Sequence, residues 1–152
     1  MALTQVQGGM ISSLPTGSVL QVVSFVDGNQ VTTSSGSFVS STVTASITPT
    51  RTTSKIFISV ALCVDTLASN TQGMTTIYRN NTTNLALGLS NDAFNDSFNT
   101  GGRLISTVSM QYLDSPATTS STAYTVYLKA SGSSVNLNVG GGSTITLMEI
   151  AG

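Results

Sequence analysis

The chain has 152 residues, of which 39% are hydrophobic and 7% are charged, and its net charge is −1. This length suits a single domain with a sizeable core, and the charged fraction is far below the usual value of about 25%. The five Lys and Arg residues are scattered and too few to neutralise a nucleic-acid backbone or to bind a membrane surface. We therefore expect no nucleic-acid partner and no membrane insertion.

Serine and threonine take the place of the missing charges, with 24 residues each. Threonine favours strands and serine favours turns, so this bias predicts an all-β chain. Cys63 is the single cysteine, which excludes an intrachain disulfide. The start of the chain lacks the basic and apolar regions of a signal peptide, and no run approaches the ~20 apolar residues of a membrane span. We expect neither a signal peptide nor a membrane span.

Residues 1–16 differ from the rest of the chain. Their apolar side chains have a loosely helical spacing, which Gly8 and Gly9 interrupt and Pro15 ends. No side chain in this segment is charged, and so short a segment cannot bury its own apolar groups. We expect residues 1–16 to form an attachment arm and residues 17–152 to form one domain. The side chains assigned to attachment are Leu3, Val6, Met10, Ile11 and Leu14.

Short runs of alternating apolar and polar residues, separated by turn residues, follow from Gly17 to the C-terminus. This spacing is typical of a sandwich or jelly roll. We expect a single antiparallel β-sandwich, or jelly-roll-like domain, of about nine strands, with polar loops over residues 90–102 and 114–122. The predicted strands cover residues 19–26, 42–48, 54–65, 74–79, 85–89, 104–113, 124–129, 135–139 and 144–150.

The strand predicted over residues 54–65 is expected to be central. Five aliphatic side chains alternate on one of its faces, which is a strong strand signal. The opposite face carries Lys55, Phe57, Ser59, Ala61 and Cys63, which are mostly small or uncharged. We therefore expect both faces to be covered, the second one by another sheet or by another copy of the chain, and the Cys63 thiol to be buried. The five aliphatic residues are Ile56, Ile58, Val60, Leu62 and Val64.

Four segments in this order and spacing resemble a family of small bacteriophage structural proteins and the ends of longer tail-fibre-like proteins, found in cyanobacterial and marine phages. They are GSVLQVV (residues 17–23), SITP (46–49) followed by SKI (54–56), YLDSPATTS (112–120) and STITLMEIA (143–151). The start, MALT followed by GMI (9–11), is similar to the virion-attachment leaders of some tailspikes and fibres.

The resemblance implies a β-sandwich, commonly trimeric, located in the virion as an appendage, a decoration or a receptor-binding tip. A virion protein of this kind is assembled in the host cytoplasm, and its partners are other copies of itself and proteins of the baseplate, tail or capsid. The family offers no set of catalytic residues that could be matched to positions in this chain.

The residues themselves also argue against catalysis. Without histidine, Ser-His and Cys-His pairs and histidine-ligated zinc are impossible. Most of the six carboxylates fall at the predicted strand ends, where acidic residues commonly cap turns. Asp92, Asn95, Asp96 and Asn99 form the only oxygen-rich cluster in the sequence, and their spacing does not match an EF-hand. We expect no enzyme, no cofactor and no metal.

Two aromatic residues in the predicted 90–102 loop make it the candidate receptor-contact site. Exposed rings beside Asn and Asp are typical of surfaces that bind sugars or proteins, so a host surface glycan is a candidate partner. The more common outcome for two large rings is that they pack back onto the domain or into a subunit contact. The candidate residues are Asp92, Phe94, Asn95, Asp96 and Phe98.

Three functions are compatible with these observations. The first is a homotrimeric tail-fibre-type appendage that docks on the particle through its arm and contacts the host. The second is a capsid decoration or head-fibre protein of the same particle. The third belongs to a different class, a free carbohydrate-binding module, although the chain lacks tryptophan, a frequent sugar platform.

Overall fold

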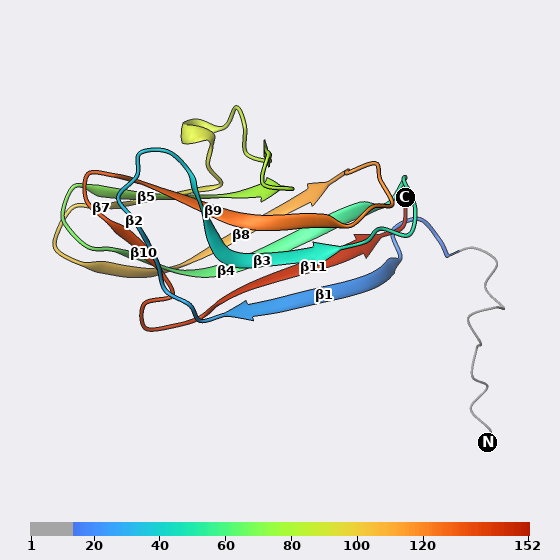
Figure 1. Cartoon of the computed structure of the whole chain (residues 1–152), viewed down its shortest axis with the longest axis horizontal. Helices are drawn as coiled ribbons and strands as arrows, with labels where there is room; N and C mark the ends of the chain where they lie inside the picture. Colours follow the sequence, from blue (N-terminus) through green and yellow to red (C-terminus); the bar gives the residue numbers. More distant parts are fainter. Residues whose placement is uncertain (1–13) are drawn as a thin grey trace, which may run out of the picture.

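The alternation of apolar and polar residues produces eleven strands in the computed structural model of the chain, which describes residues 14–152 (Figure 1). Within that range the only helix is a short 3-10 turn, η2 (Ser90–Asp92), and no helix is long and apolar enough to cross a membrane. The strands are β1 (Val19–Asp27), β2 (Val31–Thr33), β3 (Val39–Ile47), β4 (Lys55–Thr66), β5 (Thr71–Arg79), β6 (Thr83–Asn84), β7 (Asn95–Asn99), β8 (Leu104–Asp114), β9 (Thr122–Ser131), β10 (Val135–Leu137) and β11 (Ser143–Ile150).

Sheet A is organised around β4, as the sequence predicts for this strand. One edge of β4 pairs with β8 along its whole length. The other edge pairs with β11 over its first part and with β10 at its end, and β1 and β2 continue the sheet outward from these two strands. All of these pairings are antiparallel, which leaves β1 and β8 as the two long edge strands.

Sheet B lies over sheet A and has β9 and β5 at its centre (Figure 1). Strand β9 pairs with β3 on one edge and with β5 on the other. The far edge of β5 pairs with β7 at one end and with the short β6 at the other. These pairings are also antiparallel, so the predicted antiparallel β-sandwich is confirmed.

The core lies between the two sheets and consists of the side chains that alternate inward. From β4, all five predicted aliphatic residues are at most 2% exposed, which confirms the predicted inner face of this strand. Facing them from sheet B are the fully buried Tyr124, Val126 and Leu128 of β9, with Ile77 of β5. Since β-branched and aromatic side chains pack well on a pleated surface, this composition suits a sandwich core.

Three parts of the strand prediction are wrong or incomplete. Residues 85–89, predicted as a strand from their alternating leucines, form turns in which Leu87 and Leu89 are exposed. The predicted 90–102 loop contains β7, and the short β2 was not predicted. In each case long-range pairing decided the outcome: β7 is held by β5 and β2 by β10, whereas Leu87 has no strand to pair with.

The prediction that a second sheet covers the outer face of β4 is wrong. Sheet B covers only the inner face, and the outer side chains Lys55 and Ala61 are exposed. Phe57, Ser59 and Cys63 are partly exposed, so the prediction of a buried Cys63 thiol is wrong. The thiol contacts the carbonyl oxygen of Val139 at 3.4 Å. Coverage of this face by another copy of the chain stays a prediction.

The start of the described chain is anchored beside its end. The amide of Gly17 donates to the carbonyl of Ala151 at 2.7 Å, and the amide of Ala151 donates to the carbonyl of Ser18 at 2.8 Å. Of the five predicted attachment residues, Leu14 is 38% exposed, and Leu3, Val6, Met10 and Ile11 lie outside the described residues. The described chain therefore begins at the end of the sandwich where the C-terminus lies (Figure 1).

Candidate functional site

The outer face of sheet A is built from side chains that four strands align in rows. Residues paired in register point to the same side of an antiparallel sheet. One row contains Val22 of β1, Met148 of β11, Phe57 of β4 and Leu113 of β8. Val22 is 55% exposed and Leu113 is 48% exposed, and the two residues between them are partly exposed. An apolar stripe thus crosses the whole width of the sheet.

The neighbouring rows on this face consist of small uncharged side chains. The next row contains Ser24, Thr146, Ser59 and Gln111, and in it the hydroxyls of Ser24 and Thr146 lie 3.0 Å apart. From β1 to β8, the outer side chains of residues 19–26, 144–150, 55–63 and 107–113 include one charge, that of Lys55. A face of this kind offers little electrostatic resistance to association.

The outer face of sheet B has a different character, because polar and aromatic side chains alternate on it. Across β7, β5 and β9, the register places Phe98, Gln72 and Ser131 in one row. In the adjacent row, Met74 of β5 lies between Asp96 of β7 and Lys129 of β9. Phe98 is 52% exposed, whereas Met74 is buried. The side chains of these two rows on the outer face are Phe98, Gln72, Ser131, Asp96, Met74 and Lys129.

An aromatic cluster adjoins these rows. The rings of Tyr78 and Tyr127 are stacked with centroids 4.0 Å apart, and the ring of Phe38 meets Tyr78 edge-on at 6.2 Å. The Lys129 ammonium lies 4.5 Å from the centroid of Phe38 and donates to the carbonyl of Asn91 at 2.7 Å. Burial, together with the neighbouring Tyr127 and Asp92, raises the pKa of Tyr78, so its phenol remains protonated at neutral pH.

A cavity of about 470 Å³ opens beside this cluster. Its volume is in the range of about 300–1,000 Å³ that small-molecule sites commonly have. Lys129 is its only charged lining residue, and among the described residues no carboxylate lies within ion-pair distance of it. The lining residues are Ser34, Gly36, Gln72, Met74, Asn91, Lys129, Ala130, Ser131 and Gly132.

The structure separates the five predicted receptor-contact residues. Phe94 packs against Tyr112, with ring centroids 5.5 Å apart, and lies against the core. Asp92 accepts a hydrogen bond from the amide of Gly88, and the Asn95 amide donates to Ser97. Asp96 and Phe98 are exposed on the outer face of sheet B. The expectation that both rings pack back therefore holds for Phe94 and not for Phe98.

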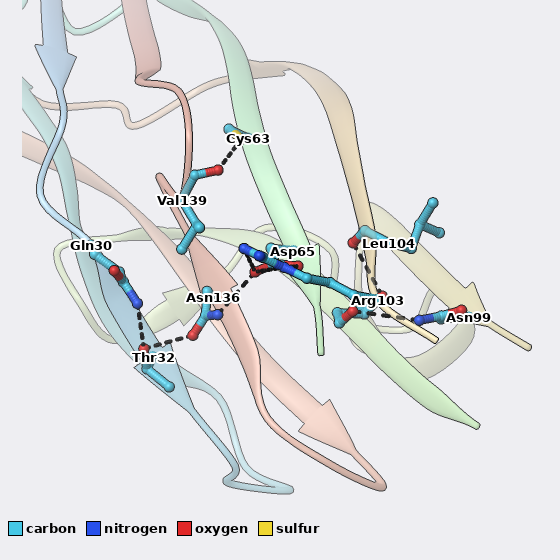
Figure 2. A network of polar contacts seen from close by, with 10 residues as sticks. Gln30, Thr32, Cys63, Asp65, Asn99, Arg103, Leu104, Asn136 and Val139 are labelled. Atoms are coloured by element: carbon cyan, nitrogen blue, oxygen red, sulfur yellow. Dashed lines mark hydrogen bonds and ion pairs between the residues drawn. The ribbon is translucent and has the colours of Figure 1, made fainter. Parts of the chain in front are cut away.

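Most of the carboxylates are occupied by contacts that hold the fold together. Asp65 is fully buried and accepts three hydrogen bonds from the Arg103 guanidinium, at 2.9–3.2 Å, and one from Asn136 (Figure 2). Asp114 pairs with Arg79 at 2.8 Å and accepts from the Tyr124 hydroxyl at 2.7 Å. No group of three metal-ligating side chains comes together within residues 14–152.

Asp65 predicts a pH dependence of folding. The hydrogen bonds from Arg103 hold the pKa of this carboxyl below its ordinary value, against the opposing effect of burial. Because the pKa of Asp65 is lower in the folded state, its carboxylate stabilises the fold fully at pH values above its unfolded-state pKa of about 4. This stabilisation is lost as the pH falls through the folded-state pKa. We expect the free energy of unfolding to fall as the pH drops from 5 to 2.

The variant Asp65→Asn tests this origin of the acid sensitivity. It should lower the free energy of unfolding at pH 7 by roughly 1–3 kcal/mol, since hydrogen bonds to a charged group are lost. Its unfolding free energy, measured by urea titration at each pH, should also fall less between pH 5 and pH 2 than that of the wild type. Equal acid slopes for both proteins would show that Asp65 does not contribute.

Sequence reasoning missed most of the outer face of sheet B. Gln72 and Lys129 are separated by more than fifty positions, and only the register between β5 and β9 brings them to one cavity. Asn91 gives no signal in the sequence, because asparagine is common in loops. The alternation of Tyr127, Lys129 and Ser131 was a usable signal, since it places all three on one face of a strand.

Comparisons with known proteins add little to these observations. No protein-family model and no curated protein matches the chain. Among solved structures, it is similar to a mutant VP2 protein of infectious bursal disease virus in T=1 particles, with 12% sequence identity and a TM-score of 0.45. The match covers 99% of this chain and 41% of that chain, so this chain spans about two fifths of its length. At this level of similarity we infer neither a shared function nor a shared assembly.

Proposed function

We propose that this chain is a structural subunit of a bacteriophage virion, a homotrimeric tail-fibre-type appendage that docks through its N-terminal arm and contacts the host surface. The observation that carries the proposal is the outer face of sheet A. The resemblance of four sequence segments to phage structural proteins supports the class of particle, and the exposed outer face supports an assembled subunit over a free one.

The outer face of sheet A exposes apolar side chains to water. The apolar stripe from Val22 to Leu113 runs across all four strands, and Val26 on β1 is 69% exposed. Contiguous apolar patches on a soluble protein commonly mark interaction sites. Neither β1 nor β8 carries a lysine or a proline, the residues that usually protect an edge strand from pairing. A closed symmetric assembly would cover both the face and an edge.

The number of subunits and the site of attachment come from the sequence resemblance, which favours a trimer and a leader-like arm. In this proposal the uncharged segment that ends at Leu14 binds another virion protein of the baseplate, tail or capsid. Cryo-electron microscopy of particles that carry the chain tests the location directly. Density at the tail would support the appendage, and density spread over the capsid would support the alternative role of a decoration protein.

Deleting residues 1–14 should abolish attachment without unfolding the domain. The first backbone hydrogen bonds that anchor the described chain begin at Gly17, after the deleted segment. Burying the apolar side chains of the arm contributes on the order of several kcal/mol at ~25 cal/mol per Å², partly offset by the cost of ordering the segment. Occupancy on particles lacking the protein, measured after incubation with the truncated chain, should fall below one tenth of that of the full chain.

The full-length chain added to the same particles is the control, and circular dichroism verifies that the truncated chain keeps its β-sheet signal. A truncated protein that is well folded and restores full occupancy would exclude the arm as the docking element. The arm would then be free to pack on its own trimer.

A further inference from the structure

We propose that the outer face of sheet B binds a neutral oligosaccharide at the cavity between Gln72, Asn91 and Lys129, with a sugar ring stacked on Phe98. This inference deepens the proposed function, since it names the class of host molecule that the appendage would contact. The ligand class follows from the side chains that converge here.

The geometry brings one exposed ring and several hydrogen-bonding groups within the span of a short oligosaccharide. Phe98 and Ser131 lie on the two strands that flank Gln72, so about 10 Å separates their backbones at the usual strand spacing of about 4.8 Å. Gln72 lies between them and lines the cavity. A ring placed over Phe98 would therefore have its hydroxyls within reach of Gln72 and of the cavity.

The groups around the cavity supply both donors and acceptors, as a ligand rich in hydroxyls requires. Amide side chains of Gln72 and Asn91 donate and accept, the Ser131 hydroxyl does both, and the Lys129 ammonium donates only. The Lys129 ammonium donates one hydrogen bond to the Asn91 carbonyl and lies over the Phe38 ring, and these two contacts fix its position. Its other N–H donors remain for a ligand. Phe98 offers the apolar surface on which the C–H face of a sugar can pack.

The fixed backbone around the cavity favours a preformed site. Gly132 has φ +100, and a Cβ at this position would lie 2.5 Å from the carbonyl oxygen of Asn70, so only glycine fits the turn that ends β9. The Asn91 side chain donates to Asp96 at 2.9 Å, which ties the loop after β6 to β7. A site that does not need ordering on binding loses less free energy to conformational entropy.

Charge distinguishes a neutral ligand from an acidic one. Lys129 is the only cation at the cavity, and Asp96 lies in the same row on the other side of Met74. The exposed carboxylate of Asp96 repels an anion and accepts hydrogen bonds from hydroxyls. This balance disfavours a phosphate, a sulfate or an acidic sugar and suits a neutral one.

Binding of the purified full-length chain to an array of neutral and acidic oligosaccharides tests the inference, followed by calorimetric titration of the best neutral glycan. We expect binding to one or more neutral glycans. The variants Phe98→Ala and Lys129→Met should each weaken that binding at least tenfold, because the first removes the stacking surface and the second removes the ammonium donor while keeping an unbranched side chain of similar length.

Matched controls carry the same changes on the other sheet. Phe25→Ala removes a ring that is 42% exposed on β1, and Lys55→Met removes the exposed lysine of β4, so both should leave glycan affinity unchanged. If Lys129→Met fails to fold, Gln72→Ala takes its place with the same expected loss. No binding to any neutral glycan, binding to acidic glycans only, or unchanged affinity in the folded cavity variants would overturn the inference. Because the assay uses the isolated chain, its failure leaves the tests of virion location and assembly unaffected.

Discussion

Replacing Leu62 with alanine should lower the free energy of unfolding by about 2–5 kcal/mol, the range observed for buried leucines that leave a cavity. Leu62 is 1% exposed and lies at the centre of β4, among the inward side chains that both sheets contribute. Every strand pairing of sheet A except those of β1 and β2 involves β4, so its packing affects most of the sheet. Urea denaturation followed by circular dichroism measures the change.

Leu87→Ala is the matched control, since it makes the same substitution at a leucine that is 76% exposed in a turn. It should change the unfolding free energy by less than about 0.5 kcal/mol, as surface substitutions usually do. Equal effects of the two substitutions would contradict the assignment of β4 to the core.

Replacing Phe57 with lysine should dissociate the proposed trimer. Phe57 lies in the middle of the apolar stripe on the outer face of sheet A, between Met148 and Leu113. A lysine there would carry an ammonium without a carboxylate partner into the subunit contact, which costs several kcal/mol. Because 1.4 kcal/mol corresponds to a factor of ten in affinity, we expect association to weaken at least about 100-fold.

Light scattering coupled to size-exclusion chromatography measures this change at micromolar concentration. The wild type should have three times the chain mass of 15.6 kDa, and the Phe57→Lys variant should have the mass of one chain. Ser46→Lys places the same charge on the exposed side of β3 in sheet B and should remain a trimer. A wild-type protein that is monomeric, or a Phe57→Lys variant that stays trimeric, would contradict assembly through this face.

The sequence predicts only part of the candidate site. The aromatic and acidic residues of segment 90–102 predict a contact site that includes Asp96 and Phe98, and both lie on the outer face of sheet B. Phe94, four positions earlier, packs on Tyr112. Residues four apart share a face of a strand, so alternation does not separate the two rings. They differ because Phe98 lies in β7, which β5 holds in register, whereas Phe94 precedes that strand.

The fold class and the central strand follow from local sequence patterns. Alternation in residues 56–64 fixes which side chains of β4 face the core, because a strand has a period of two and burial selects its apolar side. The turn residues between runs indicate many of the chain reversals, although not those around β2 and β7. These are local properties, and local reasoning recovers them.

The open face of each sheet, and the residues that meet on it, depend on how the strands pair and pack. The outer side of β4 is uncovered because sheet B packs on the inner side alone, and the small residues of that outer side are equally compatible with a buried face. Gln72, Phe98 and Lys129 come together because β5 pairs with both β7 and β9. Strand register is set by contacts between distant segments, so the order of residues along one segment does not contain it.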